Sequence, residues 1–169
     1  MNIKQEVSVN KVEKDAEDYF SNGFFCCEAV VASIMDNFEL DIPREVIGMA
    51  SGMAVGAGRS GCMCGALNGG ILTLGIFFGR SQLSGKDDPK VVKCMALTHE
   101  LHDWFKQATG KNSTCCRVLT REFDMSKGEH FQQCVYFTGM TAGKVAEIVI
   151  RELGLTNLDK KESLSTQTV

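Results

Sequence analysis

The sequence predicts an all-α fold, a single helical domain built around a glycine-rich central helix. Apolar residues recur near the 3.6-residue spacing of helices, whereas no alternating β pattern persists for more than a few residues. Residues 60–79 carry no charge, as expected of a helix that its neighbours bury on all sides. With 169 residues, the chain can bury a core without disulfide or metal staples.

The first predicted helical region covers residues 10–38. Its apolar stripe consists of Val12, Ala16, Tyr19, Phe20, Val30, Ile34 and Phe38. Gly23 interrupts the stripe, which leaves open a joint between two helices. Asp41 and Pro43 then indicate the start of another helix.

The clearest helix begins at Asp88, an N-cap residue followed by proline at the first helical position, and ends at Gly110. Its predicted buried stripe is Val91, Cys94, Met95, Leu101, Trp104, Phe105 and Ala108. Ser113 is a candidate N-cap for a short helix through Leu119. Thr141 is a candidate N-cap for a last helix that Gly154 ends. We therefore divide the chain into a helical cysteine-rich domain, residues 1–154, and a polar, loosely held tail, residues 155–169.

The uncharged stretch of residues 60–79 is just long enough to cross a bilayer. Its many Gly, Ser, Thr and Asn residues and the lack of basic or aromatic flanks favour a buried central helix over a membrane anchor. Gly61, Gly65 and Gly69 have the spacing that lets a neighbouring helix or a bound group approach a helix backbone. Gly65 and Gly69 are therefore candidate cofactor-binding positions.

The net charge of −3 disfavours a nucleic-acid partner. The first 20 residues lack the apolar core and cleavage site of a secretory signal, so we expect a cytoplasmic protein. Thiols are kept reduced in that compartment, which makes eight cysteines hard to explain as structural disulfides. They suggest redox-active or metal-binding thiols, with small buried hydrophobes as the alternative.

Three other motifs carry little weight. Residues 56–61 match G-x-G-x-x-G but lack the surrounding βαβ pattern of a dinucleotide site. His99 and His102 are three residues apart, whereas a metalloprotease helix needs a spacing of four. His130 and Cys134 have that spacing and could share a helix face, but we interpret them as unrelated residues.

The cysteines form no C-x-x-C pair, which disfavours zinc-ribbon and thioredoxin-type sites. Adjacent helical residues point about 100° apart, so only one cysteine of a doublet can face a given site. A site would therefore collect single thiols from distant segments. Cys62, Cys64, Cys115 and Cys116 follow predicted helix starts and lie near arginines, an environment that favours the thiolate.

Four stretches resemble the redox-active protein family named for the pattern C_GCAxxG_C_C. They are residues 23–30 with Cys26, residues 64–70 with Cys64 and Gly69, residues 116–120 with Cys116, and finally Cys134. The chain reads Cys-Gly-Ala where the family label reads Gly-Cys-Ala, and Cys27, Cys62, Cys94 and Cys115 are additional. The resemblance spans roughly residues 16–150 and implies a mostly helical fold and a redox role, without naming a substrate.

The leading hypothesis brings Cys26, Cys64, Cys116 and Cys134 together in the core. They would either exchange disulfides or bind an iron–sulfur cluster or another thiolate-bound metal such as zinc or Cu(I). We favour redox use over structural zinc, because the core is large enough without a metal. In an exchange mechanism, Cys64 or Cys116 would attack and Cys26 or Cys134 would resolve.

The competing hypothesis is a non-catalytic helical module in which the cysteines fill the core. Its glycine-rich helix would pack against a partner or a second copy, and a homodimer is compatible with either hypothesis. The sequence does not identify the electron donor or acceptor that a redox role requires.

Overall fold

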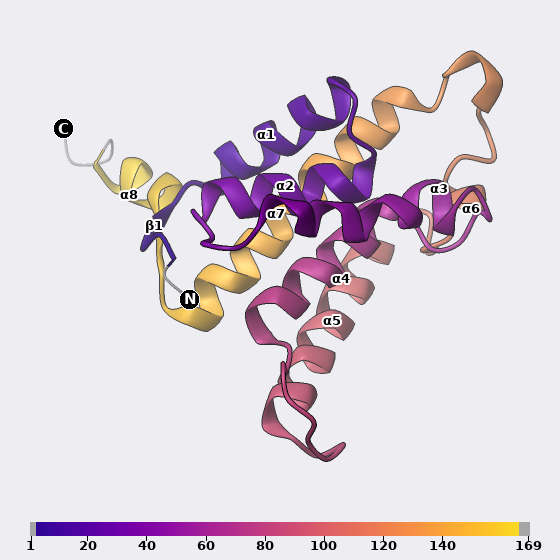
Figure 1. Cartoon of the computed structure of the whole chain (residues 1–169). Helices are drawn as coiled ribbons and strands as arrows, with labels where there is room; N and C mark the ends of the chain where they lie inside the picture. Colours follow the sequence, from indigo (N-terminus) through magenta and orange to yellow (C-terminus); the bar gives the residue numbers. More distant parts are fainter. Residues whose placement is uncertain (1–2, 166–169) are drawn as a thin grey trace.

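The computed structural model describes residues 3–165 and is built almost entirely of helices. Helices α1 (Val9–Ser21), α2 (Cys26–Asn37) and α7 (Phe131–Leu153) lie side by side (Figure 1). Helices α4 (Gly65–Phe78) and α5 (Pro89–Ala108) project from them as an antiparallel pair (Figure 1). The all-α fold with a glycine-rich helix at its centre is confirmed, because α4 packs against α2, α5 and α7.

Shorter elements connect these helices. The 3₁₀ helix η1 (Arg44–Met53) leads into α3 (Ala54–Ala57), while α6 (Cys116–Leu119) and the 3₁₀ helix η2 (Met125–Lys127) precede α7. Residues 47–55, which precede the G-x-G-x-x-G match where a dinucleotide site needs a strand, lie in η1 and α3. The G-x-G-x-x-G match is therefore a consequence of glycine content, as we interpreted it.

The joint at Gly23 is present between α1 and α2. Gly23 has a φ of 122°, a conformation that side-chain-bearing residues rarely adopt, so the chain turns there. Phe25 then precedes α2, and its backbone N–H donates to the Glu28 carboxylate. This contact satisfies one of the free amides at the start of α2 and places Cys26 at its first helical residue.

Helix α5 begins as predicted, since the Asp88 side chain accepts a hydrogen bond from the Lys90 N–H and Pro89 is the first helical residue. Its predicted buried stripe is partly wrong, because Met95 is 68% exposed and Ala108 is also exposed. The buried face is centred on Leu97, Leu101 and Phe105. These residues are four apart and form a narrower stripe, because α5 packs on one side only.

The last long helix starts eleven residues earlier than predicted, since its N-cap is His130 and not Thr141. Thr141 is not an N-cap but lies inside α7, where its hydroxyl donates to the Phe137 carbonyl one turn back. A buried threonine can satisfy its own hydroxyl in this way without ending a helix. Gly154 ends α7 as predicted, with a left-handed φ of 66°.

The tail is more ordered than predicted within the residues that the structure describes. Strand β2 (Thr156–Asn157) pairs in parallel with β1 (Glu6–Val7), and helix α8 (Leu158–Ser165) follows. Asp159 of α8 accepts hydrogen bonds from the Ser8 hydroxyl and the Asn10 N–H at the start of α1. These contacts connect the N-terminal segment to the C-terminal segment. Residues 166–169 of the predicted tail lie outside the described part.

Within the described residues, no helix combines the length and the apolar character needed to span a membrane. The uncharged helix α4 is only 14 residues long, and its neighbours cover most of it.

Candidate functional site

A pocket of about 270 Å³ lies where α2, α4, α6 and α7 begin. Cys26 is the first residue of α2, Cys64 is the N-cap of α4, Cys116 is the first residue of α6, and Cys134 lies in the first turn of α7. All four line this pocket, and none forms a disulfide. The structure thus brings together the four cysteines that the sequence singled out.

Each cysteine doublet sends one thiol into the pocket. Cys26 lines it, whereas Cys27 points into the hydrophobic core and is fully buried. Cys116 lines it, whereas Cys115 does not and forms a disulfide instead. The roughly 100° rotation between helical neighbours accounts for the division of Cys26 and Cys27 in α2, whereas Cys115 differs from Cys116 because it is the extended N-cap residue before α6. Cys94 is remote from the pocket, on α5 beside His99 and His102.

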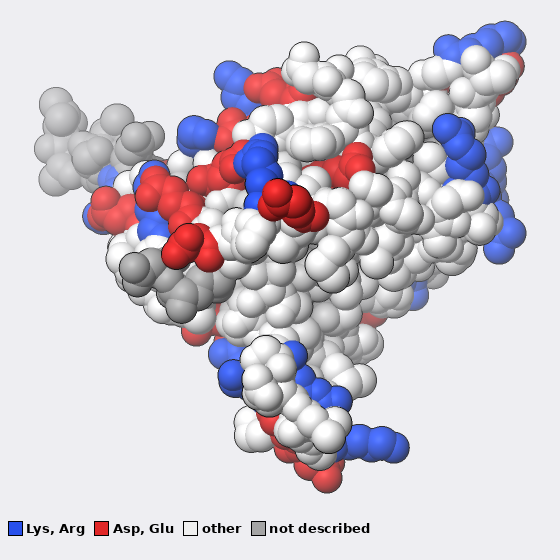
Figure 2. Space-filling model, viewed as in Figure 1, with Lys and Arg blue, Asp and Glu red and all other residues white. Residues whose placement is uncertain are grey.

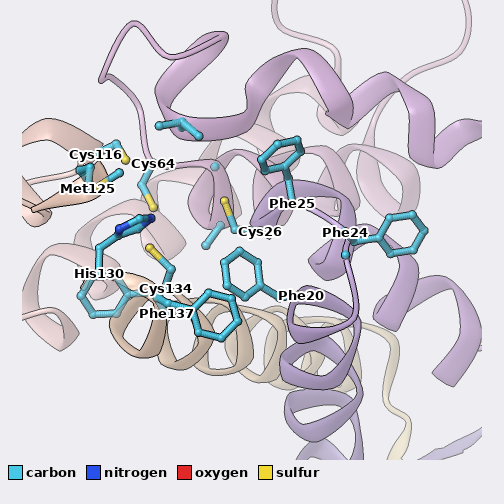
Figure 3. Close-up of a pocket in the computed structure, with 15 residues that line it drawn as sticks. Phe20, Phe24, Phe25, Cys26, Cys64, Cys116, Met125, His130, Cys134 and Phe137 are labelled. Carbon is cyan, nitrogen blue, oxygen red and sulfur yellow. The ribbon is translucent and has the colours of Figure 1, made fainter. Parts of the chain in front are cut away.

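Apart from His130, the rest of the pocket wall is apolar. It consists of glycine, alanine, valine, methionine and five phenylalanines: Phe20, Phe24, Phe25, Phe131 and Phe137. No Asp, Glu, Lys or Arg is among the described residues that line it. Figure 3 shows the sulfur atoms of Cys26, Cys64 and Cys134 directed toward a common space, with the Phe20 ring beside it. The pocket therefore offers soft sulfur donors and apolar contacts, but no charged group.

His130 is the one nitrogen-bearing side chain in the pocket wall among the described residues. It is the N-cap of α7, and the Cys134 N–H donates to its carbonyl. Its imidazole lies beside Cys64 and Cys134 (Figure 3), and its Nδ1 is buried without a hydrogen-bond partner. The four-residue spacing of His130 and Cys134 in the sequence was the signal that they share a helix face. Our interpretation of them as unrelated residues was wrong, because both line the pocket.

Burial and mutual repulsion keep the pocket thiols protonated. Burial is the main cause that raises the pKa of Cys64, Cys116 and Cys134, the last to about 12. A hydrogen bond with Cys27, followed by burial, raises the pKa of Cys26. The charge of Cys26 raises the pKa of each of the other three, which is a further sign that the four thiols are neighbours.

The expectation of thiolates at the helix starts is therefore wrong for Cys64 and Cys116 in the metal-free protein. A helix N-terminus favours a negative charge, but the desolvation of an almost fully buried sulfur outweighs it here. Cys62 and Cys115, the other two expected thiolates, form a disulfide with Cα atoms 4.2 Å apart. The sequence argument against disulfides missed this pair, because its members are 53 residues apart and lie in no recognisable motif.

The two glycines proposed to contact a cofactor have different surroundings. Gly65 lines the pocket, and a Cβ atom there would lie 2.5 Å from the Cys26 sulfur. Gly69 is one turn further along α4 and does not line the pocket. A Cβ at Gly69 would lie 2.5 Å from the Cys27 carbonyl oxygen, so its absence allows α4 to approach α2 closely.

The histidines of α5 lie apart from this pocket. His99, His102 and Asp103 bring three potential ligand atoms within 4.8 Å of one another. His99 is largely exposed, and Asp103 already contacts both rings, at 3.4 Å from His99 and 2.9 Å from His102. These contacts agree with our interpretation of two surface histidines.

The fold and the four-thiol pocket together define a helical cysteine protein. A family model described as "Putative redox-active protein (C_GCAxxG_C_C)" matches residues 24–148, and the chain belongs to this family. A search of curated proteins and a search of solved structures each found no match.

Proposed function

We propose that Cys26, Cys64, Cys116 and Cys134 bind a thiolate-ligated redox centre, for which an iron–sulfur cluster is the best chemical fit. The convergence of four unpaired thiols from four chain segments on one pocket carries this proposal. Four cysteine thiolates are the usual ligand set of [2Fe–2S] and [4Fe–4S] clusters. Such a cluster would accept one electron from a donor protein and pass one electron to an acceptor protein.

The electrostatics of the pocket suit an anionic cluster better than four free thiolates. Without a metal, ionising these thiols would place several negative charges in an apolar cavity. Metal binding displaces the thiol protons and compensates the charge. The N-termini of α2, α4 and α7 meet at the pocket, and their free amides favour any negative charge that remains.

Disulfide exchange by the same four thiols is the weaker alternative. Exchange starts from a thiolate, but burial raises the pKa of all four thiols. A non-catalytic module with cysteines as core filler fits less well still. Filler cysteines would be dispersed through the core, as Cys27 is, whereas these four surround a pocket.

The test is anaerobic purification of the full chain, followed by metal and acid-labile sulfide analysis and visible spectroscopy. We expect iron and sulfide in equal amounts and a brown protein. Cys26→Ser and Cys134→Ser should each lower bound iron at least tenfold. Cys94→Ser is the matched control and should retain it, because Cys94 is outside the pocket. Zinc without sulfide would contradict a redox centre, and a metal-free protein whose four pocket thiols pair on mild oxidation would support exchange instead.

Gly65→Ala provides a second test that leaves every cysteine in place. The added methyl group would lie 2.5 Å from the Cys26 sulfur, so that sulfur must move away from the other ligands. We expect a several-fold loss of bound iron, measured by elemental analysis, with an unchanged far-UV circular dichroism spectrum. Full iron occupancy in this variant would show that Cys26 is not a ligand.

A further inference from the structure

The disulfide between Cys62 and Cys115 lies beside the four-thiol pocket but faces away from it. Neither residue lines the pocket, although Cys64 and Cys116 follow closely in the chain and do. Cys64 and Cys116 are only 7% and 9% exposed, whereas Cys62 and Cys115 are both partly exposed. The disulfide is thus partly open to solvent, as are the two pocket cysteines Cys26 and Cys134, so an external reagent can reach it.

Backbone contacts hold the two disulfide-bearing segments together independently of the sulfur bond. The Cys64 N–H donates to the Thr114 carbonyl at 2.7 Å, and the Arg117 N–H donates to the Gly61 carbonyl at 3.0 Å. The Arg117 side chain packs against Gly61, where a Cβ would lie 3.0 Å from it. Breaking the disulfide would therefore leave its two sulfurs close together, as reversible exchange requires.

The surroundings of this disulfide are basic. Lys and Arg gather over the end of the molecule that carries α3 and α6 (Figures 1 and 2). Arg59 and Arg117 are exposed there, and neither forms an ion pair with another described side chain. A nearby positive charge attracts the thiolate of an external dithiol and stabilises the thiolate that departs during disulfide exchange.

We propose that Cys62 and Cys115 form a second redox site, which exchanges electron pairs with an external dithiol. A thiolate of the dithiol attacks one sulfur, forms a mixed disulfide and releases the other cysteine as a thiolate. The second thiol of the dithiol then attacks the mixed disulfide and frees the first cysteine. The dithiol leaves as a disulfide, two electrons pass to the protein, and the two released thiolates take up the two protons that the dithiol loses. Oxidation by an external disulfide is the reverse sequence.

The test uses folded, metal-free, wild-type protein, so its result does not depend on whether the pocket binds a cluster. The protein is equilibrated with graded mixtures of reduced and oxidised dithiothreitol. Free thiols are then alkylated and located by mass spectrometry. We expect Cys62 and Cys115 to change together, with the two-electron dependence of a single disulfide, while Cys94 remains a thiol throughout. A pair that stays oxidised in excess dithiothreitol until denaturant is added, or that never forms under air, would overturn the proposal.

Substitution of the arginines separates a redox role from a structural one. Arg59→Gln with Arg117→Gln should slow the reduction of the disulfide by dithiothreitol at least threefold at neutral pH, because the departing thiolate loses its neighbouring charges. Arg80→Gln is the control, since Arg80 contacts Ser84 and Gly85 in the loop after α4. Equal rates in all three proteins would show that the basic surroundings do not assist exchange.

Discussion

Burial decides the protonation state of the four pocket cysteines. A helix N-terminus adjoins each of these cysteines, yet the pKa of each thiol is raised. Placing a negative charge in the apolar cavity costs more free energy than the helix N-terminus contributes. The protein can therefore keep four sulfurs close together without mutual repulsion until a metal displaces their protons. Cysteines of this kind are poor nucleophiles but suitable ligands.

The raised pKa of Cys134 predicts an alkaline loss of stability in the metal-free protein. Its pKa is about 12 in the folded chain against an ordinary value of 9.0, so the folded state holds this proton more tightly than the unfolded state does. The resulting stabilisation is complete below pH 9 and disappears as the pH rises toward 12. We expect this one thiol to account for a loss on the order of 2 kcal/mol by pH 11.

Urea unfolding between pH 8 and pH 11 measures this effect. The slope of unfolding free energy against pH should be shallower in Cys134→Ala than in the wild type, and Cys94→Ala is the comparison variant. Parallel slopes in all three proteins would show that Cys134 ionises as readily in the folded chain as in the unfolded one.

The sequence identified the four pocket cysteines but not the other features of the site. The rotation between helical neighbours indicated that one member of each doublet would face the site, and family resemblance indicated Cys26, Cys64, Cys116 and Cys134. Neither argument could find the Cys62–Cys115 disulfide or the place of His130 in the pocket wall. The disulfide depends on how the loop before α4 lies against the loop before α6, which no local pattern encodes, whereas His130 reaches the pocket wall as the N-cap of α7, one turn before Cys134.

At the scale of elements, one glycine of α4 sets the distance between two helices. A Cβ at Gly69 would lie 2.5 Å from the Cys27 carbonyl oxygen and 3.0 Å from its Cα, and backbone atoms cannot move aside as a side chain can. We expect Gly69→Ala to destabilise the protein by about 2 kcal/mol.

Gly75→Ala is the matched control on the same helix. No atom beyond its neighbours lies within 4 Å of a Cβ at that position, so the substitution should be neutral or stabilise by up to about 1 kcal/mol. Thermal unfolding of the two variants makes the comparison. A Gly69→Ala protein as stable as Gly75→Ala would show that α2 and α4 are less closely packed than described.

Helix ends were more predictable from the sequence than helix lengths. The Asp88–Pro89 start, the Gly23 joint and the Gly154 stop rely on local backbone chemistry and are all present. The start of α7 was misplaced because Thr141 has the side chain of an N-cap residue. Only the tertiary position of that residue, buried inside a long helix, shows that its hydroxyl bonds one turn back.

At the scale of the whole molecule, the C-terminal segment holds the N-terminal helix. The Asp159 carboxylate accepts bonds from Ser8 and Asn10 across 151 and 149 residues of chain, and Lys161 pairs with Glu6. We expect Asp159→Ala to cost about 1 kcal/mol, the usual effect of losing a helix cap, which lowers Tm by about 3 °C in a protein of this size. Asp87→Ala removes the same charge from an exposed loop and is the calorimetric control; an equal Tm in both variants would contradict the contact.

The arrangement of helices around the pocket was beyond local sequence reasoning. Helical periodicity shows which face of each segment is buried, but not which segments meet. Only the resemblance to a family linked the four cysteines, and its matching stretches include Phe24 and Phe25 but not the other three phenylalanines of the pocket wall. The five phenylalanines come from α1, the joint after it and α7, whose apolar residues look in sequence like any other core position.

Because the pocket takes its first thiol from α2 and its last from α7, it is incomplete until nearly all of the chain has been made. A ribosome-bound chain that ends before α7 would contain Cys26, Cys64 and Cys116 but not Cys134. Loading with the proposed metal centre would therefore follow synthesis and docking of the final long helix. A protein caught before that moment would be the form most open to oxidative damage in the cell.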